Sequence, residues 1–538
     1  MIRLFFGFSL FLTTLSCVVS AQGILPTTHY KYQVTLQITE QIARTFGDRR
    51  AAPRLEMPVR IKSGRIAEII SIGEPVLYFD EKLYDICQSF GADSTTALAL
   101  LLSHELTHFY ERHNEWMGFA QLAKKLPPSV KSEEKKKLEL QADQRGMFQA
   151  FVAGYYPFSI VKPLYEKIYT EYKLELSIPG YFSRDERIKL AQEQAVVARN
   201  AGVAFETGNF LFLNGQYALA ERCYRYVSNL LPIREVIHNQ GIAWLQQAYQ
   251  MTPLSTMPFK LPIELAATNR MLSDLRSGEE EKRQKMLNEA ARIFTNLIEQ
   301  DPTYEAAYLG LCSTHLLQNQ NGSADDLLKK WEMNGGKLSP NGQLLRAITF
   351  AQNKNERRLK KQLELLNNVH EQQYNVSLLK KYFSWLNQRE ELNIDSLQMF
   401  QKKSLIPYFK SNSIENQIYN LKFPLALTSL SNPFNLPGQD FIRTSYMLTN
   451  GVLSFHVKLA DKQFDVIRAT ALAAPWQTKQ QLKKGDTEAR LLELYGAPSR
   501  KIPAGNDAFW YGYENARCWF VVNNGCVEEW MVFEPKNQ

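Results

Sequence analysis

Residues 98–108 read LALLLSHELTH, an apolar helical run that ends in a His-Glu-x-x-His pattern. His104 and His108 are four positions apart, so on a helix they project from one face with about 6 Å of axial rise between them, which suits two imidazoles on one tetrahedral metal. Glu105 follows the first His and points in a different direction, as a base must when it acts on water at the metal without becoming a ligand. The stretch therefore predicts a zinc site.

A second helical segment completes the predicted site. Residues 138–148 read LELQADQRGMF, in which Glu139 and Asp143 share one helix face at a four-residue spacing. Glu139 can supply the third ligand, and Asp143 can accept the second ring N–H of a zinc-bound His, which fixes the tautomer of that His. The alternative is a charged helix face that happens to carry two carboxylates, and the two segments together favour the zinc site.

A third histidine follows the first motif. If the helix of residues 98–108 continued, His113 would lie about 900° round it from His104, on the opposite face. We therefore expect His113 to be structural.

The two motifs resemble the HExxH and ExxAD pair of the HtpX- and BepA-like zinc metallopeptidases, which belong to the gluzincins. The residues that directly follow each motif resemble family sequence as well. The resemblance implies an α+β catalytic domain in which His104, His108 and Glu139 hold Zn²⁺. It also implies that Glu105 is the general base for hydrolysis of peptide bonds in protein or peptide substrates.

Residues 183–188 resemble the closing segment of the same family, in which a His-Pro pair precedes an Arg that faces the site. The Arg position is Arg187, whereas Tyr181 and Phe182 stand where the family has His and Pro. The resemblance makes Arg187 and Tyr181 candidate stabilisers of the transition state. For Tyr181, simple packing is the alternative, and the departure from His-Pro favours it.

The composition is that of a large globular protein. The length of 538 residues suggests about three domains, and 45% hydrophobic and 22% charged residues are ordinary values that argue against long disorder. The net charge of +8 is mild for this length, and no Lys/Arg cluster is interleaved with aromatic residues. Nucleic acid is therefore not expected as a partner.

Residues 1–21 predict a cleaved signal peptide, with Arg3, an apolar region and a small-residue cleavage site at residues 19–21. Cys17 offers a lipoprotein alternative, but Thr14 stands where a Leu is expected, so simple cleavage is favoured. No later stretch reaches the ~18 apolar residues that a membrane-spanning helix needs. We therefore expect a mature chain without a transmembrane segment in the periplasm or outside the cell.

Such a location permits disulfide bonds, but the cysteines give them little support. Of the six cysteines, five remain without Cys17, an odd number at scattered positions. A hairpin that turns at residues 524–525 would place Asn523, not Cys518, opposite Cys526. No bridge is predicted there.

Before the zinc motif, residues 32–46 predict a helix, and residues 65–72 and 76–79 predict two strands. In gluzincins, a strand beside the zinc helix presents an edge to which extended substrate adds as another strand, and one of these two is the candidate. The Asn-Ala-Phe sequence usual on that strand in the family is not visible here.

From about residue 201 the pattern changes to paired helices. The residues spaced as in one tetratricopeptide repeat are Gly208, Gly215, Tyr217, Ala220, Tyr224, Val227 and Pro232. The same offsets recur at Ala290, Phe294, Leu297 and Pro302. We expect three or more irregular repeats, with an insertion around residues 251–283, that form an array with a concave face for peptides or proteins.

After residue 404 the composition shifts toward Pro, Asn, aromatic and alternating apolar residues, which predicts a separate α+β domain. Residues 484–498 predict a capped helix with a Gly stop. Strands are predicted next at residues 508–513, 517–522 and 526–533. Residues 484–533 resemble the BamE/SmpA-like fold of outer-membrane assembly lipoproteins, and no catalytic role is inferred for them.

The sequence thus predicts a multidomain protein. Its parts are a signal peptide at 1–21, an α+β gluzincin-type metallopeptidase domain at 22–199, an α-helical tetratricopeptide solenoid at 200–400 and a small α+β domain at 401–538. The implied function is a periplasmic or secreted zinc metalloendopeptidase in envelope protein quality control, whose repeats and C-terminal domain recruit clients such as outer-membrane assembly proteins.

The alternative function is a chaperone or assembly factor with a latent or structural zinc site. Structural zinc normally has four protein ligands, often Cys. No Cys lies near the two motifs, which favours catalysis.

Overall fold

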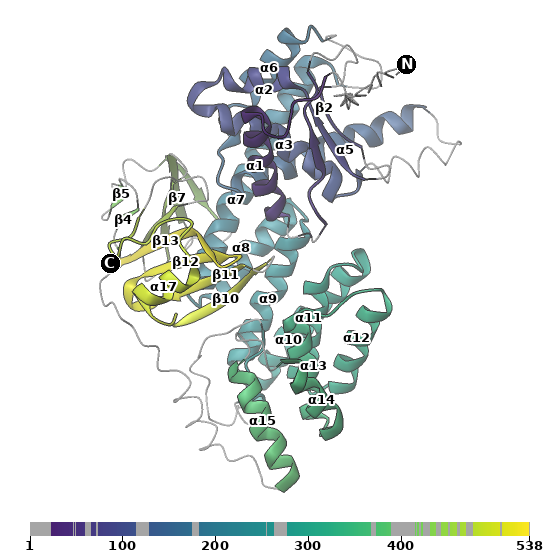
Figure 1. Ribbon diagram of the computed structural model, residues 1–538, viewed down its shortest axis with the longest axis vertical. Coiled ribbons are helices and arrows are strands. Elements are labelled where there is room, and N and C mark those ends of the chain that lie inside the picture. The colour runs from purple at the N-terminus through teal and green to yellow at the C-terminus, as the bar shows by residue number, and fades with distance from the viewer. Residues whose placement is uncertain are drawn as a thin grey trace, which may run out of the picture.

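The chain folds into an N-terminal α+β part, a helical array and a C-terminal β-sheet (Figure 1). The computed structural model describes residues 23–46, 48, 50–59, 66–70, 74–113, 128–174, 182–253, 256–262, 277–366, 373–388, 415, 417–418, 421–422, 431–436, 443–449, 452–459, 463–469, 477–505 and 508–536. The predicted signal peptide, Cys17 and Tyr181 lie outside these residues. No helix of the described part is long and apolar enough to cross a membrane.

The N-terminal part surrounds the two motifs. Its elements are α1 (Tyr30–Thr45), β1 (Arg54–Glu56), β2 (Ala67–Ile70), β3 (Val76–Phe79), α2 (Glu81–Gln88), α3 (Ser94–Tyr110), α5 (Pro128–Val152) and α6 (Val161–Glu171). The described strands form a sheet in the order β1-β3-β2, in which β2 is an edge strand that contacts α3. The predicted helix and both predicted strands are confirmed, whereas β1, which pairs in parallel with β3, was not predicted.

Helix α7 (Arg184–Leu213) is a continuous helix of 30 residues that joins the N-terminal part to the array. It begins with a capping box, in which Ser183 and Glu186 satisfy each other's backbone N–H groups. It packs against α5, α6 and α8 (Tyr217–Leu230). The predicted boundary between residues 199 and 200 thus lies inside one helix.

The array continues from α8 as helices that each pack against the next. They are α9 (Arg234–Gln250), α10 (Ser277–Gln300), α11 (Glu305–Leu317), α12 (Asn321–Met333), α13 (Pro340–Gln352), α14 (Glu356–Leu366) and α15 (Gln373–Gln388). A Cβ added to Gly241 of α9 or to Gly310 of α11 would meet the ring of Phe294 at 2.8 or 2.6 Å. The Phe294 ring on α10 therefore fills the space that these two glycines leave. A larger residue at either of the two helix contacts would meet the ring.

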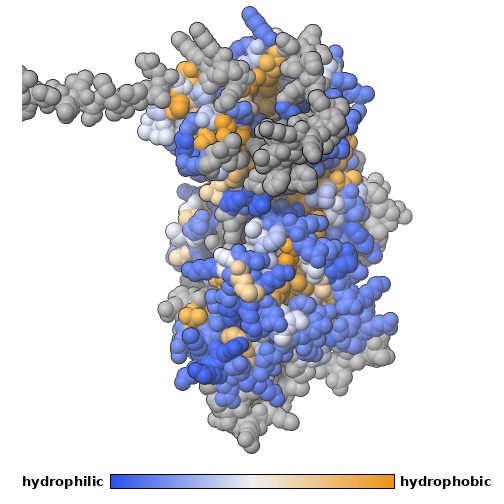
Figure 2. All heavy atoms as spheres, turned by 90° about the vertical axis from the view of Figure 1, so that its right-hand side faces the viewer, coloured by the Kyte–Doolittle hydropathy of each residue, from blue (hydrophilic) through white to orange (hydrophobic). Residues whose placement is uncertain are grey.

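Figure 2 shows the face of the molecule on which much of this array is exposed. That face is mostly hydrophilic, with smaller groups of hydrophobic residues among the hydrophilic ones. The apolar residues of α10 to α15 are instead collected in one core between the helices. The array is thus a stack of helix pairs, and its assignment to tetratricopeptide repeats stays a prediction.

Within the described C-terminal residues, eight strands form one antiparallel sheet in the order β10-β11-β12-β13-β9-β8-β7-β6. The strands are β6 (Ser431–Asn435), β7 (Arg443–Thr449), β8 (Val452–Lys458), β9 (Gln463–Ala469), β10 (Arg500–Gly505), β11 (Ala508–Tyr513), β12 (Cys518–Asn523) and β13 (Cys526–Lys536). The last three confirm predicted strands, but the sheet extends well beyond residues 484–533. Helix α17 (Glu488–Tyr495) confirms the predicted helix, with Thr487 as N-cap and Gly496 at φ 77° as its stop.

The predicted hairpin between β12 and β13 is also confirmed. Asn523 pairs with Cys526, and Asn524 and Gly525 in the turn have positive φ values of 47° and 73°. This is the backbone conformation that an Asn-Gly hairpin turn requires. The described cysteines, from Cys87 to Cys526, are free thiols.

One face of the C-terminal sheet packs against α7. The ring of Phe210 on α7 lies 5.3–6.0 Å from the rings of Phe455, Phe464 and Phe533 on three strands. In the same interface, the Arg468 guanidinium on β9 pairs with Glu206 of α7 and, at 2.6 Å, with Glu529 of β13. Helix α17 packs against the other face, so the sheet is covered on both sides.

The buried charges at this interface make a stability prediction. Replacing Arg468 with Ala leaves Glu206 charged and unpaired in a buried place, and we expect the free energy of unfolding to fall by about 3–5 kcal/mol. Urea denaturation followed by tryptophan fluorescence measures this loss. Arg490→Ala is the matched control, because the Arg490–Glu493 pair is exposed and worth only about 0–1 kcal/mol. Equal effects of the two substitutions would contradict the prediction.

Candidate metal centre

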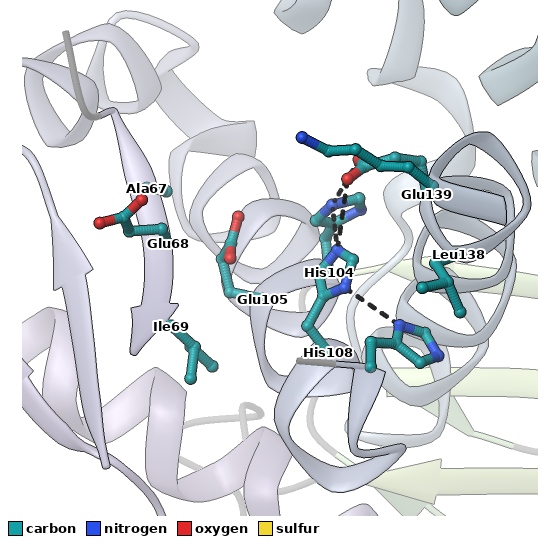
Figure 3. A pocket seen from close by; sticks show the side chains of 10 residues that line it. Ala67, Glu68, Ile69, His104, Glu105, His108, Leu138 and Glu139 are labelled. Atoms are coloured by element: carbon teal, nitrogen blue, oxygen red, sulfur yellow. Dashed lines mark hydrogen bonds and ion pairs between the residues drawn. The ribbon is translucent and has the colours of Figure 1, made fainter. Parts of the chain in front are cut away.

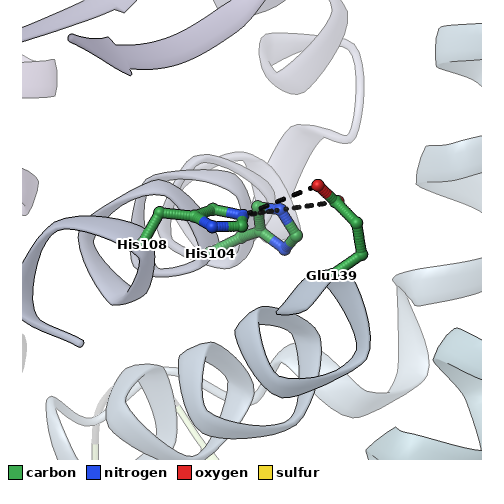
Figure 4. A group of neighbouring side chains, drawn as sticks. All are labelled: His104, His108 and Glu139. Atoms are coloured by element: carbon green, nitrogen blue, oxygen red, sulfur yellow. Dashed lines mark hydrogen bonds and ion pairs between the residues drawn. The ribbon is translucent and has the colours of Figure 1, made fainter. Parts of the chain in front are cut away.

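Three predicted ligands from two helices meet at one point (Figure 4). The Nε2 atoms of His104 and His108 are 3.2 Å apart, and the Glu139 carboxylate oxygens lie 3.4 Å from the first and 3.8 Å from the second. Ligand atoms at about 2.0–2.1 Å from a tetrahedral zinc ion are separated by about 3.3–3.4 Å. The donor set and its spacing therefore fit a zinc ion held by two imidazoles and a carboxylate.

The ligands meet because α3 and α5 cross closely at a glycine. A Cβ added to Gly146 of α5 would lie 2.9 Å from the backbone nitrogen of His104, closer than real Cβ contacts come. The inner face of α3 is fully buried, with Leu98, Leu102 and Leu106 at 0% exposure. The helix that carries both imidazoles is thus fixed in rotation by its apolar side chains, and Gly146 brings the carboxylates of α5 within reach.

Asp143 takes the supporting position that the sequence predicts. Its Oδ1 lies 2.9 Å from Nδ1 of His104, which leaves Nε2 of that ring directed at the ligand cluster. The same carboxylate accepts hydrogen bonds from the Tyr165 hydroxyl at 3.0 Å and from the Arg187 guanidinium, whose Nη2 is 2.7 Å away. Burial raises the pKa of Asp143, but Arg187 and His104 outweigh burial and hold that pKa well below its usual range.

The Arg187 guanidinium thus pairs with Asp143. It also lies 3.9 Å from the Glu139 carboxylate and 5.1 Å from the centre of the Tyr165 ring, over which it stacks. Its action on a transition state stays a prediction. Tyr165 was not predicted, because an aromatic residue on a helix of ordinary pattern gives no sign of the carboxylate that it will contact.

In the protein without bound metal, the cluster balances its own charges. Burial lowers the pKa of His104, but Asp143 and Glu139 outweigh burial and raise it to about 10. Burial raises the pKa of Glu139, yet His104 above all lowers it to about 2. For His108, burial and the charge of His104 together lower the pKa to about 3. The protonated His104 ring thus supplies the positive charge that a metal ion would otherwise bring. Metal binding must release this proton.

Glu105 has a different environment from Glu139. Its carboxylate lies between β2 and the histidines (Figure 3) and makes no hydrogen bond or ion pair with a described residue. Burial first, then the nearby Glu139 and Glu68 carboxylates, raise its pKa to about 7 against the opposing effect of His104. A carboxylate with a pKa near the working pH is suited to take up and return a proton.

Glu105 lines two cavities. The first, of about 340 Å³, is lined by Ala67, Glu68, Ile69, His104, Glu105, His108, His113, Lys135, Leu138 and Glu139. The second, of about 190 Å³, is lined by Ile66, Ala67, Leu83, Leu101, His104, Glu105, Tyr165, Ile168, Tyr169 and Arg187. Ala67 of β2 lines both cavities, and Glu68 and Ile69 of the same strand line the first.

His113 does not lie on the face of α3 opposite the ligands, where the helix pattern placed it. Helix α3 ends at Tyr110, and Arg112 adopts a left-handed conformation with φ 57°, which turns the chain back. His113 therefore lies beside His108, with the Nδ1 atoms of the two rings 3.0 Å apart. The prediction assumed that the helix continued, and an Arg in a position that usually takes Gly gave no stop signal.

The chain matches no family model, and no curated protein matches it significantly. The family relationship that the motifs indicate therefore stays a prediction. What the site can do is argued below from its geometry and charges.

The ligand assignment makes a prediction about metal affinity. Glu139→Ala removes a ligand atom and should weaken zinc binding more than Asp143→Asn, which should cost about 10–100-fold by loosening His104. Competition with a chelating dye measures both, with Glu134→Ala, an exposed carboxylate of the same helix, as the control. Zinc binding by Glu139→Ala as tight as that of the wild type would show that the third ligand is misassigned.

The raised pKa of Glu105 predicts how stability depends on pH. The usual pKa of a Glu carboxyl group is 4.5. At higher pH the folded protein holds the Glu105 proton more tightly than the unfolded chain does, so the wild type loses stability as pH rises from 4.5 to about 7. Glu105→Gln lacks this loss. In chelator-treated protein we expect its melting temperature to exceed that of the wild type at pH 8, with the difference gone at pH 4.5, and an exposed control, Glu193→Gln, to change neither. A difference that does not vary with pH would refute this.

Proposed function

We propose that this protein is a periplasmic or secreted zinc metalloendopeptidase that hydrolyses peptide bonds of protein substrates. The observation that carries the proposal is the arrangement of three ligand atoms at tetrahedral spacing with a separate carboxylate, Glu105, at the same cavity. Structural zinc sites use four protein ligands, whereas catalytic sites keep one position for water or substrate. Three ligands among the described residues, beside an open cavity, therefore support catalysis over a structural role.

A bound zinc ion would supply Lewis-acid chemistry, which makes water more acidic and polarises a peptide carbonyl. Glu105 would take one proton from the attacking water as the water oxygen adds to the carbonyl carbon. Glu105 would then deliver that proton to the amide nitrogen as the C–N bond breaks, and the carboxylate is regenerated. Glu105 lines both cavities together with His104, so it lies where both transfers would take place.

Substrate binding follows from the edge strand. An extended peptide that pairs with β2 would pass Glu105 and His104, because Ala67 of β2 lines both cavities together with these two residues. Such pairing uses backbone hydrogen bonds, so affinity depends little on sequence, and cavities for side chains supply the preference.

The array and the C-terminal sheet support a role in recruiting protein clients, among them envelope or outer-membrane assembly proteins. Both are attached to α7, whose first turn carries Arg187 of the site. The mostly hydrophilic face in Figure 2 favours polar contacts with such clients. A chaperone or assembly factor with a latent zinc site is the second candidate, because these parts make up more than half of the chain's length.

The proposal predicts the effect of Glu105→Gln. This change removes the base and leaves every ligand in place, so zinc content and fold should be unchanged while hydrolysis of casein falls at least ~10²-fold. Zinc analysis, a thermal melt and a fluorescent casein assay measure the three properties. Glu193→Gln on α7 is the matched control and should keep full activity, because its side chain is exposed away from the cavities.

Three outcomes separate the candidates. Casein cleavage by the wild type that a chelator stops and zinc restores supports the peptidase. Full turnover by Glu105→Gln would refute the mechanism. Absence of cleavage by the wild type, with equal protection of an aggregating client by the wild type and Glu105→Gln, would favour the chaperone.

A further inference from the structure

We propose that His113 is a positioning residue that holds the ring of His108 in the orientation required for metal binding. The inference deepens the proposed function and rests on it only where hydrolysis is measured. It comes from the contact between His113 and His108. His113 lies outside both motifs, in a turn that the helical sequence pattern did not predict.

The contact fixes how His108 uses its two nitrogens. Nε2 of His108 faces Glu139 and the other imidazole, so this atom needs its lone pair for the metal. The proton of His108 must then be on Nδ1, where the only short contact among described residues is Nδ1 of His113 at 3.0 Å. Only one hydrogen fits between these two nitrogens, so His108 donates it and His113 accepts it.

The acceptor is itself fixed from its other side. A ring that accepts at Nδ1 carries its hydrogen on Nε2, and the His113 side chain also hydrogen-bonds to the side chain of Gln141 on α5. Only 4% of His113 is exposed, so water does not compete for these contacts. The order Gln141–His113–His108 therefore ties the second ligand to the same helix that supplies Glu139.

The residues that lead to His113 are anchored by two sets of contacts. Left-handed Arg112 directs the chain back toward α3, and its N–H bonds to the Phe109 carbonyl at 3.1 Å. Glu111 forms an ion pair with Arg145 of α5, and Arg145 also donates to the Pro232 carbonyl at 3.1 Å. These contacts hold the His113 ring in place independently of any metal.

The two metal-binding imidazoles are thus supported by different groups. His104 donates to Asp143, whose negative charge is balanced by Arg187, whereas His108 donates to a neutral ring. A neutral acceptor orients its partner without adding negative charge beside the metal, and added negative charge would weaken the metal as a Lewis acid. His113 therefore orients the His108 ring without adding negative charge beside the metal.

The test compares zinc affinity and the visible spectrum of the Co²⁺-substituted full-length protein. We expect His113→Leu to weaken zinc binding about 10–100-fold and to change the Co²⁺ spectrum, because His108 loses its orienting partner. His113→Asn offers a carboxamide oxygen as acceptor and should restore most of the affinity. His238→Leu is the matched control: His238 is a partly buried histidine of the array that packs against Phe294 and Tyr304, so its loss should leave metal binding unchanged.

A second pair of variants keeps the ring and moves it. Proline cannot adopt the positive φ of Arg112, so Arg112→Pro should displace His113 and weaken zinc binding as His113→Leu does. Arg112→Gly keeps the turn and should bind zinc like the wild type. A thermal melt of each variant verifies folding, and this pair decides the question if His113→Leu does not fold.

The inference is overturned if His113→Leu and Arg112→Pro both bind zinc as tightly as the wild type with an unchanged Co²⁺ spectrum. It is also overturned if His113→Asn is as defective as His113→Leu, since the role would then be packing. Failure of the proposed function looks different. A wild-type protein that binds zinc but cleaves no peptide refutes the peptidase and leaves the effect of His113 on metal affinity intact.

Discussion

The close crossing of α3 and α5 is the constraint on which the site depends. His104 and His108 belong to one helix and Glu139 and Asp143 to the other, so the four side chains meet only if the two backbones come nearly into contact. Gly146 permits that approach, because any Cβ at this position would meet the backbone of His104 at 2.9 Å. Ligands that project from two packed helices are held before a metal arrives, so little conformational entropy is lost on binding.

Two glutamates at this crossing are shifted in opposite directions by what surrounds them. Both are withdrawn from water, which by itself raises the pKa of a carboxyl group. Glu139 faces two imidazoles and Arg187, so its pKa falls to about 2 and it stays ionised as a ligand must. Glu105 makes no such pairs with described residues, so burial outweighs the opposing charge of His104 and raises its pKa to about 7. Ligand and base are thus distinguished by their neighbours.

The spacing of residues predicted the parts of this site that depend on helix geometry alone. His104, His108, Glu139 and Asp143 follow a four-residue period that holds in any α-helix, and the Asn-Gly hairpin is equally local. What the sequence did not predict depends on tertiary contacts. His113 returns to the site through an unusual left-handed Arg, and strand β10 contains a Pro, which a sheet accepts there because β10 is its outermost strand.

The continuity of α7 changes how the parts of the molecule relate. Arg187 pairs with Asp143 near one end of this helix, and Glu206 pairs with Arg468 of the sheet about 29 Å further along it. Domains joined by a flexible linker would present a client to the site at a concentration set by linker length. Here the sheet and the first array helices are built on the helix that supports the site, so a client bound to them would be held at a fixed distance from Glu105. The distance from the recruiting surface to Glu105 would then determine where a client is cut, because the client chain must span that distance.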